Sequence, residues 1–211
     1  MAKTAAFKAE IKELMNLIAH SMYSDQEVFL RELVSNGADA LQKMKLAGIN
    51  DPKLYEDQQD LLIYVDVDPE ARTIAIRDTG IGMSADEVVE HLGTVAKSGT
   101  KTFLANLKAA DAEHKSELIG QFGVGFYSSF VVADKVVVKT RKAGESKAVM
   151  WESDGVEKYK TESIEKKDRG TDVILHLRED EAIEKFLQEW QVRQIITNWS
   201  NHIMAPVMMK K

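Results

Sequence analysis

Residues 61–78 read LLIYVDVDPEARTIAIRD, and this stretch decides the fold class. Apolar and polar residues alternate along 61–67 and again along 72–78, and Asp68-Pro69-Glu70-Ala71 separates the two runs. Such a pattern predicts two antiparallel strands joined by a short turn. A hairpin here argues against a doubly wound parallel sheet, in which crossover helices separate successive strands.

The rest of the chain predicts helices early and strands late, which favours an α+β two-layer sandwich. Residues 7–47 are expected to form two helices, the second with an N-cap at Ser24 or Asp25 and a C-cap at Gly48. Further helices are expected at 84–92, behind the capping box Ser84-x-x-Glu87, at 126–132 and at 183–202. Further strands are expected at 135–141, 147–152, 156–161 and 171–178. Residues 93–125, broken by three glycine turns, are interpreted as a mobile lid over a site.

Composition narrows the class of protein. The 211 residues contain no Pro/Gly/Ser linker, so one domain is expected over 1–211. A net charge of -6 argues against nucleic acid as a partner, and the absence of cysteine excludes disulfides and thiolate chemistry. No apolar stretch approaches the length of a membrane span, so a cytoplasmic location without a membrane partner is expected.

The helix LRELVSNGADALQKM, residues 30–44, carries a polar row of Glu32, Asn36, Asp39 and Lys43 at spacings of four, three and four. These side chains share one helix face. A solvated face is the simpler interpretation of such a row alone. However, Asn and the adjacent Gly37 are both poor residues for a helix interior, which indicates another reason for their presence. An Asn carbonyl suits Mg²⁺, and a carboxylate one turn away could deprotonate a water.

The stretch RTIAIRDTGIGM, residues 72–83, places Asp78 at the end of the buried face of a strand. A buried carboxylate needs a donor, and the exocyclic amine of adenine would supply one. Gly80 and Gly82 are expected to allow positive φ and close approach of a ligand. The spacing Gly80-x-Gly82-x-x-Ala85 also matches a loose dinucleotide-binding fingerprint, but the strand belongs to a hairpin and no β-α-β unit follows.

A third element, GQFGVGFYSSF at 120–130, has three glycines in six residues before a predicted helix, an arrangement suited to phosphates. The partner motifs of a protein kinase are missing, and so is a Walker sequence. An exposed flexible loop is a poor alternative because the stretch is rich in aromatic residues. Two weaker candidates are Lys97, which could contact a terminal phosphate, and Thr171, whose hydroxyl could donate a hydrogen bond at the Asp78 site. His91 and Trp151 are interpreted as structural.

In this order, E-x-x-x-N-x-x-D-A, D-x-G-x-G and G-x-x-G-x-G resemble the ATPase family of DNA gyrase, histidine kinases, mismatch-repair ATPases and the ninety-kilodalton heat-shock chaperone. RELVSNGADAL, DTGIGM, LGTVAKSGTK and IGQFGVGFYSSFVVADKV resemble the chaperone branch in its bacterial form, and the resemblance covers nearly the whole chain from Phe7. It implies the Bergerat-type fold, with a mixed, mostly antiparallel sheet under helices.

The resemblance also implies roles for individual residues. Glu32 corresponds to the general base for ATP hydrolysis and Asn36 to the Mg²⁺ ligand. Asp78 corresponds to the residue that binds the adenine amine, supported through water by Thr171. Asp39, Lys43, Gly82, Met83 and Phe126 correspond to nucleotide-pocket residues and Lys97 to the lid lysine near the γ-phosphate. The phosphate-binding turn corresponds to Gly120, Gln121, Phe122, Gly123, Val124 and Gly125.

The resemblance implies ATP or ADP with Mg²⁺ as cofactors, client proteins as partners and a homodimer in the full-length protein. Two departures stand out: Gly37 replaces the usual Ala of the helix motif and is expected to loosen the helix, and His91 stands where eukaryotic relatives carry a nucleotide-contacting Asn. The family's middle and C-terminal dimerisation domains are absent from these 211 residues. Because the middle domain supplies an Arg to the γ-phosphate, weak hydrolysis is expected of the isolated domain. A histidine-kinase-like domain and a topoisomerase or mismatch-repair ATPase are the alternatives.

Overall fold

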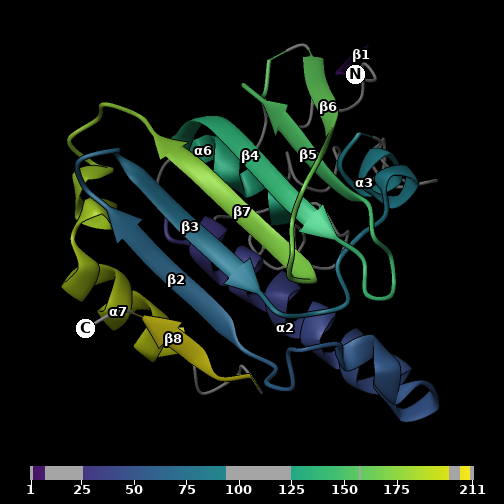
Figure 1. Ribbon diagram of the computed structural model, residues 1–211. Helices are drawn as coiled ribbons and strands as arrows, with labels where there is room; N and C mark the ends of the chain where they lie inside the picture. Colours follow the sequence, from purple (N-terminus) through teal and green to yellow (C-terminus); the bar gives the residue numbers. More distant parts are fainter. Residues whose placement is uncertain (1, 8–25, 94–124, 157, 200–204, 210–211) are drawn as a thin grey trace, which may run out of the picture.

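The computed structural model describes residues 2–7, 26–93, 125–156, 158–199 and 205–209. Their strands form one eight-stranded sheet in the order β1-β6-β5-β4-β7-β3-β2-β8 (Figure 1). The pairing of β2 with β8 is parallel, and the other pairings are antiparallel. The strands span β1 (Lys3–Ala6), β2 (Ile63–Asp68), β3 (Thr73–Asp78), β4 (Ala133–Arg141), β5 (Ala148–Ser153), β6 (Lys158–Ile164), β7 (Gly170–Leu177) and β8 (Val207–Met209). The mixed, mostly antiparallel sheet is therefore confirmed.

Helices form the second layer, and the long helix α2 (Val28–Asn50) crosses behind the sheet (Figure 1). It contacts β2, β3 and β7 through the predicted apolar stripe, whose members Leu30, Leu33, Val34, Leu41 and Met44 are all buried. The other helices in the described residues are α3 (Ala85–Leu92), α6 (Ser129–Val132) and α7 (Glu189–Trp199), with 3-10 turns η1 (Pro52–Tyr55), η2 (Gly125–Ser128) and η3 (Glu184–Leu187). This arrangement confirms the α+β sandwich. Within the described residues, no helix is both long and apolar enough to cross a membrane.

Several predicted element ends are wrong. In place of the expected helix 183–202, the described residues 183–199 form η3, an extended Gln188 and α7, because the buried Phe186 packs edge-on against Phe29 with ring centroids 5.0 Å apart. Residues 200–202 lie outside the described residues. Gly48 is not the C-cap of α2, which runs on to Asn50; its missing side chain makes room for the Tyr55 ring. The proposed N-cap at Ser24 or Asp25 lies outside the described residues, as do residues 8–25 of the expected first helix.

Other elements also differ from the expectation. Strand β6 covers 158–164 rather than 156–161, and η2 forms the first part of the expected helix 126–132. Strands β1 and β8 were not predicted: all four residues of β1 are exposed, so it shows no apolar alternation, and β8 has three residues. In contrast, the capping box of α3 is present, with both the Ser84 and the Glu87 hydrogen bonds.

The turn after β3 joins the two layers. The Ile81 N–H donates to the Ala40 carbonyl of α2 at 3.1 Å, and the Ile81 carbonyl accepts from the Ala143 N–H at 2.8 Å. A Cβ on Gly80 would lie 2.7 Å from the Ala40 Cβ, so the bare backbone of Gly80 admits a helix rather than a ligand. Gly82 has the expected positive φ, +66°, whereas Gly80 does not adopt the left-handed conformation.

We expect Gly82→Ala to lower the free energy of unfolding much more than Gly144→Ala. Both glycines have positive φ, +66° and +78°, so both substitutions carry the left-handed strain of about 1 kcal/mol. A Cβ at position 82 would also overlap the Arg141 backbone carbonyl, whereas at position 144 it meets the end of the Leu54 side chain. Urea unfolding of both variants measures the difference. Equal losses would show that the turn after β3 can move away from β4.

Candidate functional site

A cavity of about 310 Å³ lies between α2, the ends of β3 and β7, the turn after β3, and α3. Eight of the predicted site residues line it: Asn36, Asp39, Lys43, Asp78, Gly82, Met83, Phe126 and Thr171. The exposed side chains of Asn36, Asp39 and Lys43 border it from one face of α2, as their spacing predicts. The structure therefore brings the polar helix face and the end of the hairpin together around one space.

Apolar side chains form the rest of the cavity wall. Leu33 contributes from α2, Ile76 from β3, Val138 from β4, Val173 from β7 and Leu92 from α3. Such a wall can enclose a flat aromatic ring, while the few polar groups at its border fix the orientation of that ring.

Asp78 is half-buried where it borders this cavity. Its Oδ1 accepts a hydrogen bond from the Gly80 N–H at 2.8 Å, so the donor expected for this carboxylate is partly supplied by its own loop. Burial raises the pKa of Asp78 to about 7, because desolvation disfavours the carboxylate more than the Gly80 N–H favours it. The charged carboxylate at the border of the cavity therefore has an unfavourable desolvation free energy, which a further hydrogen-bond donor would reduce.

Two hydroxyl groups lie beside Asp78 in the sheet. Thr171 is the direct partner of Asp78 across β3 and β7, and Thr140 is the partner of Thr171 across β4 and β7. The two hydroxyl oxygens are 3.0 Å apart, and the Met83 N–H donates to the Thr140 hydroxyl at 2.9 Å. Sequence reasoning identified Thr171 and Met83 but missed Thr140, which looks like any β-branched residue in a strand.

Glu32 lies on α2 beside the start of η2. The backbone of Gly125 packs directly against the Glu32 side chain, so a Cβ at that position would overlap the carboxylate. Burial raises the pKa of Glu32, and this effect is opposed by the Arg31 guanidinium, whose Nε lies 3.4 Å from Oε1. A carboxylate with a raised pKa is a better proton acceptor than an ordinary surface Glu.

Other predicted residues cannot be placed in the same way. Lys97, Gly120, Gln121, Phe122, Gly123 and Val124 lie outside the described residues. Conversely, sequence reasoning did not assign Glu87 to the site and treated His91 as structural, yet both border the cavity from α3. The helical spacing of four between them was the available signal.

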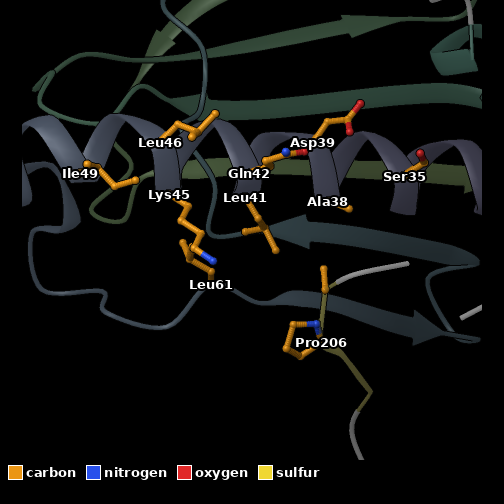
Figure 2. Close-up of a pocket in the computed structure, with 11 residues that line it drawn as sticks. Ser35, Ala38, Asp39, Leu41, Gln42, Lys45, Leu46, Ile49, Leu61 and Pro206 are labelled. Carbon is orange, nitrogen blue, oxygen red and sulfur yellow. The ribbon is translucent and has the colours of Figure 1, made fainter. Parts of the chain in front are cut away.

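A second hollow, of about 600 Å³, follows another side of α2 between Leu41, Lys45 and Ile49 of the helix and Leu61 and Pro206 (Figure 2). Of the predicted site residues that the structure describes, only Asp39 also borders this groove. The groove is larger, but the carboxylate with a pKa near 7 and the turn after β3 both belong to the smaller cavity. We therefore treat the smaller cavity as the functional site.

Comparison with known families agrees with this geometry. The family of histidine kinase-, DNA gyrase B- and HSP90-like ATPases matches residues 23–181, and the chain belongs to this family.

Within that family, the chain is similar to bacterial proteins named chaperone protein HtpG. It is 54% identical over 215 residues to the protein of Coxiella burnetii (strain RSA 493 / Nine Mile phase I), covering 100% of this chain and 33% of that protein. It is 51% identical over 209 residues to the Chromobacterium violaceum protein, covering 99% of this chain and 33% of that protein. It is 53% identical over 209 residues to the Pseudoalteromonas translucida protein, covering 99% of this chain and 32% of that protein. The chain thus spans about one third of the length of these relatives.

The raised pKa of Asp78 gives a prediction for stability. Because the folded pKa, about 7, exceeds the ordinary value of 3.8 for an Asp carboxyl, the folded state binds more protons between these values and loses stability as the pH rises through them. Asp78→Asn removes this titration and keeps an acceptor for the Gly80 N–H. We therefore expect the variant to gain stability relative to wild type from pH 5 to pH 8, by on the order of a few kcal/mol, at about 1.4 kcal/mol per pKa unit.

Urea unfolding at both pH values measures this gain for Asp78→Asn, with Asp57→Asn on an exposed loop residue as control. A difference between Asp78→Asn and wild type that does not change with pH would contradict the raised pKa.

Proposed function

We propose that this chain is the nucleotide-binding domain of a bacterial heat-shock chaperone and that it binds ATP and ADP in the cavity beside Asp78. The carrying observation is the half-buried Asp78 carboxylate, with its raised pKa, at the border of a cavity that has apolar walls and is also lined by the polar face of α2. Membership of the ATPase family and the similarity to HtpG proteins support this assignment.

In this proposal the adenine ring lies between the apolar walls and its exocyclic amine donates to Asp78. The amine replaces part of the hydration that burial removes from the carboxylate. A base that lacks the amine leaves the carboxylate without this donor, so it binds more weakly. Met83 and Phe126 border the same space, and Thr171 adds a hydroxyl next to the carboxylate.

The phosphates extend along α2 toward Asn36, Asp39 and Lys43. Asn36 lines the cavity from the exposed face of the helix. The neutral oxygen of an Asn amide suits Mg²⁺, which commonly keeps phosphate oxygens and waters as its other ligands. Bound there, the ion would neutralise phosphate charge. The glycine turn at 120–125 and Lys97 are proposed phosphate contacts on the basis of the sequence resemblance.

Glu32 is the proposed general base for hydrolysis. It lies one helical turn before Asn36, so both side chains point from the same face of α2. Burial raises the pKa of Glu32 and thereby increases its affinity for the proton of an attacking water. Gly125, the last residue of the proposed phosphate-binding turn, packs against this carboxylate.

The activity of the whole protein is a further part of the proposal. The chain spans a third of its HtpG relatives, so closure of a lid at about 93–125, N-terminal dimerisation and work on client proteins in the cytoplasm are proposed for the whole protein. Hydrolysis by the isolated domain is expected to be weak, because the γ-phosphate would lack the middle-domain Arg.

Glu32 also bears on the alternative functions. A histidine-kinase domain transfers phosphate to a partner protein and needs no water-activating base at this position. A topoisomerase or mismatch-repair ATPase works on nucleic acid, which the net charge of -6 disfavours. The HtpG relatives favour neither alternative.

Asp78→Asn tests the binding site. We expect the variant to bind Mg²⁺-ADP at least 100-fold more weakly than wild type, because an amide presents its N–H₂ group or a weaker neutral acceptor to the adenine amine. Isothermal titration calorimetry measures the affinity, with Asp57→Asn as the matched carboxamide control. Binding of ADP by Asp78→Asn at wild-type affinity would place the nucleotide elsewhere.

Glu32→Ala separates binding from hydrolysis. We expect the affinity of this domain for ADP to remain within about threefold, since Glu32 does not line the described cavity. In the full-length protein we expect phosphate release to fall by about 10²–10⁴-fold, the usual contribution of a general base. Loss of ADP binding in calorimetry would instead make Glu32 a structural residue that supports the turn at Gly125.

A further inference from the structure

Thr140 is a hydroxyl residue on a strand face that is otherwise apolar. Val136 and Val138 share its side of β4, and all three side chains are at most 1% exposed. A valine would fill the same space, so packing alone does not require the hydroxyl. A buried hydroxyl is unfavourable unless it is hydrogen-bonded, and Thr140 has three polar neighbours.

These neighbours come from two different elements. The Met83 N–H, from the turn after β3, donates to the Thr140 oxygen at 2.9 Å. On β7, the Gly170 carbonyl lies 3.2 Å from the Thr140 oxygen and the Thr171 hydroxyl lies 3.0 Å away. Thr140 thereby connects the turn that follows Asp78 to the strand that pairs with Asp78.

The hydrogen bonds of Thr140 fix the position of the Thr171 hydroxyl. The Thr140 hydroxyl has one proton and two lone pairs, and the Met83 N–H occupies one lone pair. The proton goes either to Gly170 or to Thr171; in the first case Thr171 donates to Thr140, and in the second it accepts from Thr140. In both cases one hydrogen-bonding position of Thr171 is used, so its hydroxyl is held in place where it lines the cavity.

We propose that Thr140 is a positioning residue for purine selectivity: it holds the Thr171 hydroxyl and the Met83 backbone at fixed positions beside the Asp78 carboxylate. This inference rests on the proposed nucleotide site. Thr140 does not border the cavity, so it acts through Thr171 and Met83, both of which do.

The fixed groups match the amino edge of adenine better than the edge of a 6-oxo purine. Adenine presents a donor at its exocyclic nitrogen and an acceptor at N1, whereas hypoxanthine presents an acceptor at O6 and a donor at N1. A carboxylate beside a held hydroxyl meets the first pattern when Thr140 donates to Thr171, because the carboxylate then accepts from the amine and the Thr171 proton is left to donate to N1, directly or through a water. A hydroxyl that rotates freely can meet either pattern, so discrimination falls.

The test compares ADP with inosine diphosphate. We expect Thr140→Val to bind ADP about 10-fold more weakly than wild type and inosine diphosphate within about threefold, so that the preference for ADP falls by about three- to tenfold. Thr140→Ser keeps the hydroxyl and should retain the wild-type preference. In a Thr171→Val background, Thr140→Val should change the preference no further, because the residue it positions is gone.

The outcomes separate this inference from the proposed function. Wild type that fails to bind ADP contradicts the nucleotide site itself. If wild type binds ADP but Thr140→Val loses ADP and inosine diphosphate equally, or loses neither, the positioning role is wrong. Should Thr140→Val not fold, Thr140→Ala makes the same comparison with a smaller side chain. Amide hydrogen exchange adds a readout without nucleotide: the Met83 N–H should exchange faster in Thr140→Val and not in Thr140→Ser.

Discussion

The close contact between α2 and the turn after β3 is the constraint on which the rest of the site depends. Gly80 lies against Ala40, the Ile81 N–H bonds the Ala40 carbonyl, and a Cβ on Gly37 would lie 3.2 Å from the Ile63 side chain. The helix and the hairpin can therefore approach to backbone distance. This approach places Asp78 opposite the polar face of α2, so the same contact forms the two-layer fold and the cavity.

The close approach of α2 to the sheet also explains Gly37, which the sequence analysis expected to loosen the helix. Gly37 is buried where α2 crosses Ile63, so its missing side chain serves packing between the layers. The contact to Ile63 is tight enough that an alanine here would require a shift of a few tenths of an ångström. Gly37 is less favourable than alanine in a helix by about 1 kcal/mol, and the closer packing of α2 on the sheet offsets this cost.

Local patterns predicted the parts of the molecule that local chemistry determines. The hairpin alternation, the capping box of α3 and the four-three-four spacing on α2 each depend on neighbours in sequence, and each was found. Features set by distant contacts were not predicted: the division of 183–199 depends on Phe186 meeting Phe29, and β1 is recognisable only from its pairing with β6. Thr140 was missed for the same reason, because its partners Met83 and Thr171 are remote in sequence.

The electrostatics of the cavity connect folding to ligand binding. A carboxylate at position 78 makes the folded domain less stable at neutral pH than an uncharged residue of the same shape would, since its pKa is raised to about 7. An adenine amine that donates to this carboxylate reduces its unfavourable desolvation free energy. Part of the binding affinity therefore comes from removing a destabilisation that the free domain already carries. The carboxylate keeps its raised pKa only while its side chain and turn stay in place and do not move out toward water. The packing of the turn between Ala40 and Arg141 prevents such movement, and the Thr140 hydroxyl binds the turn to β7 on the remaining side.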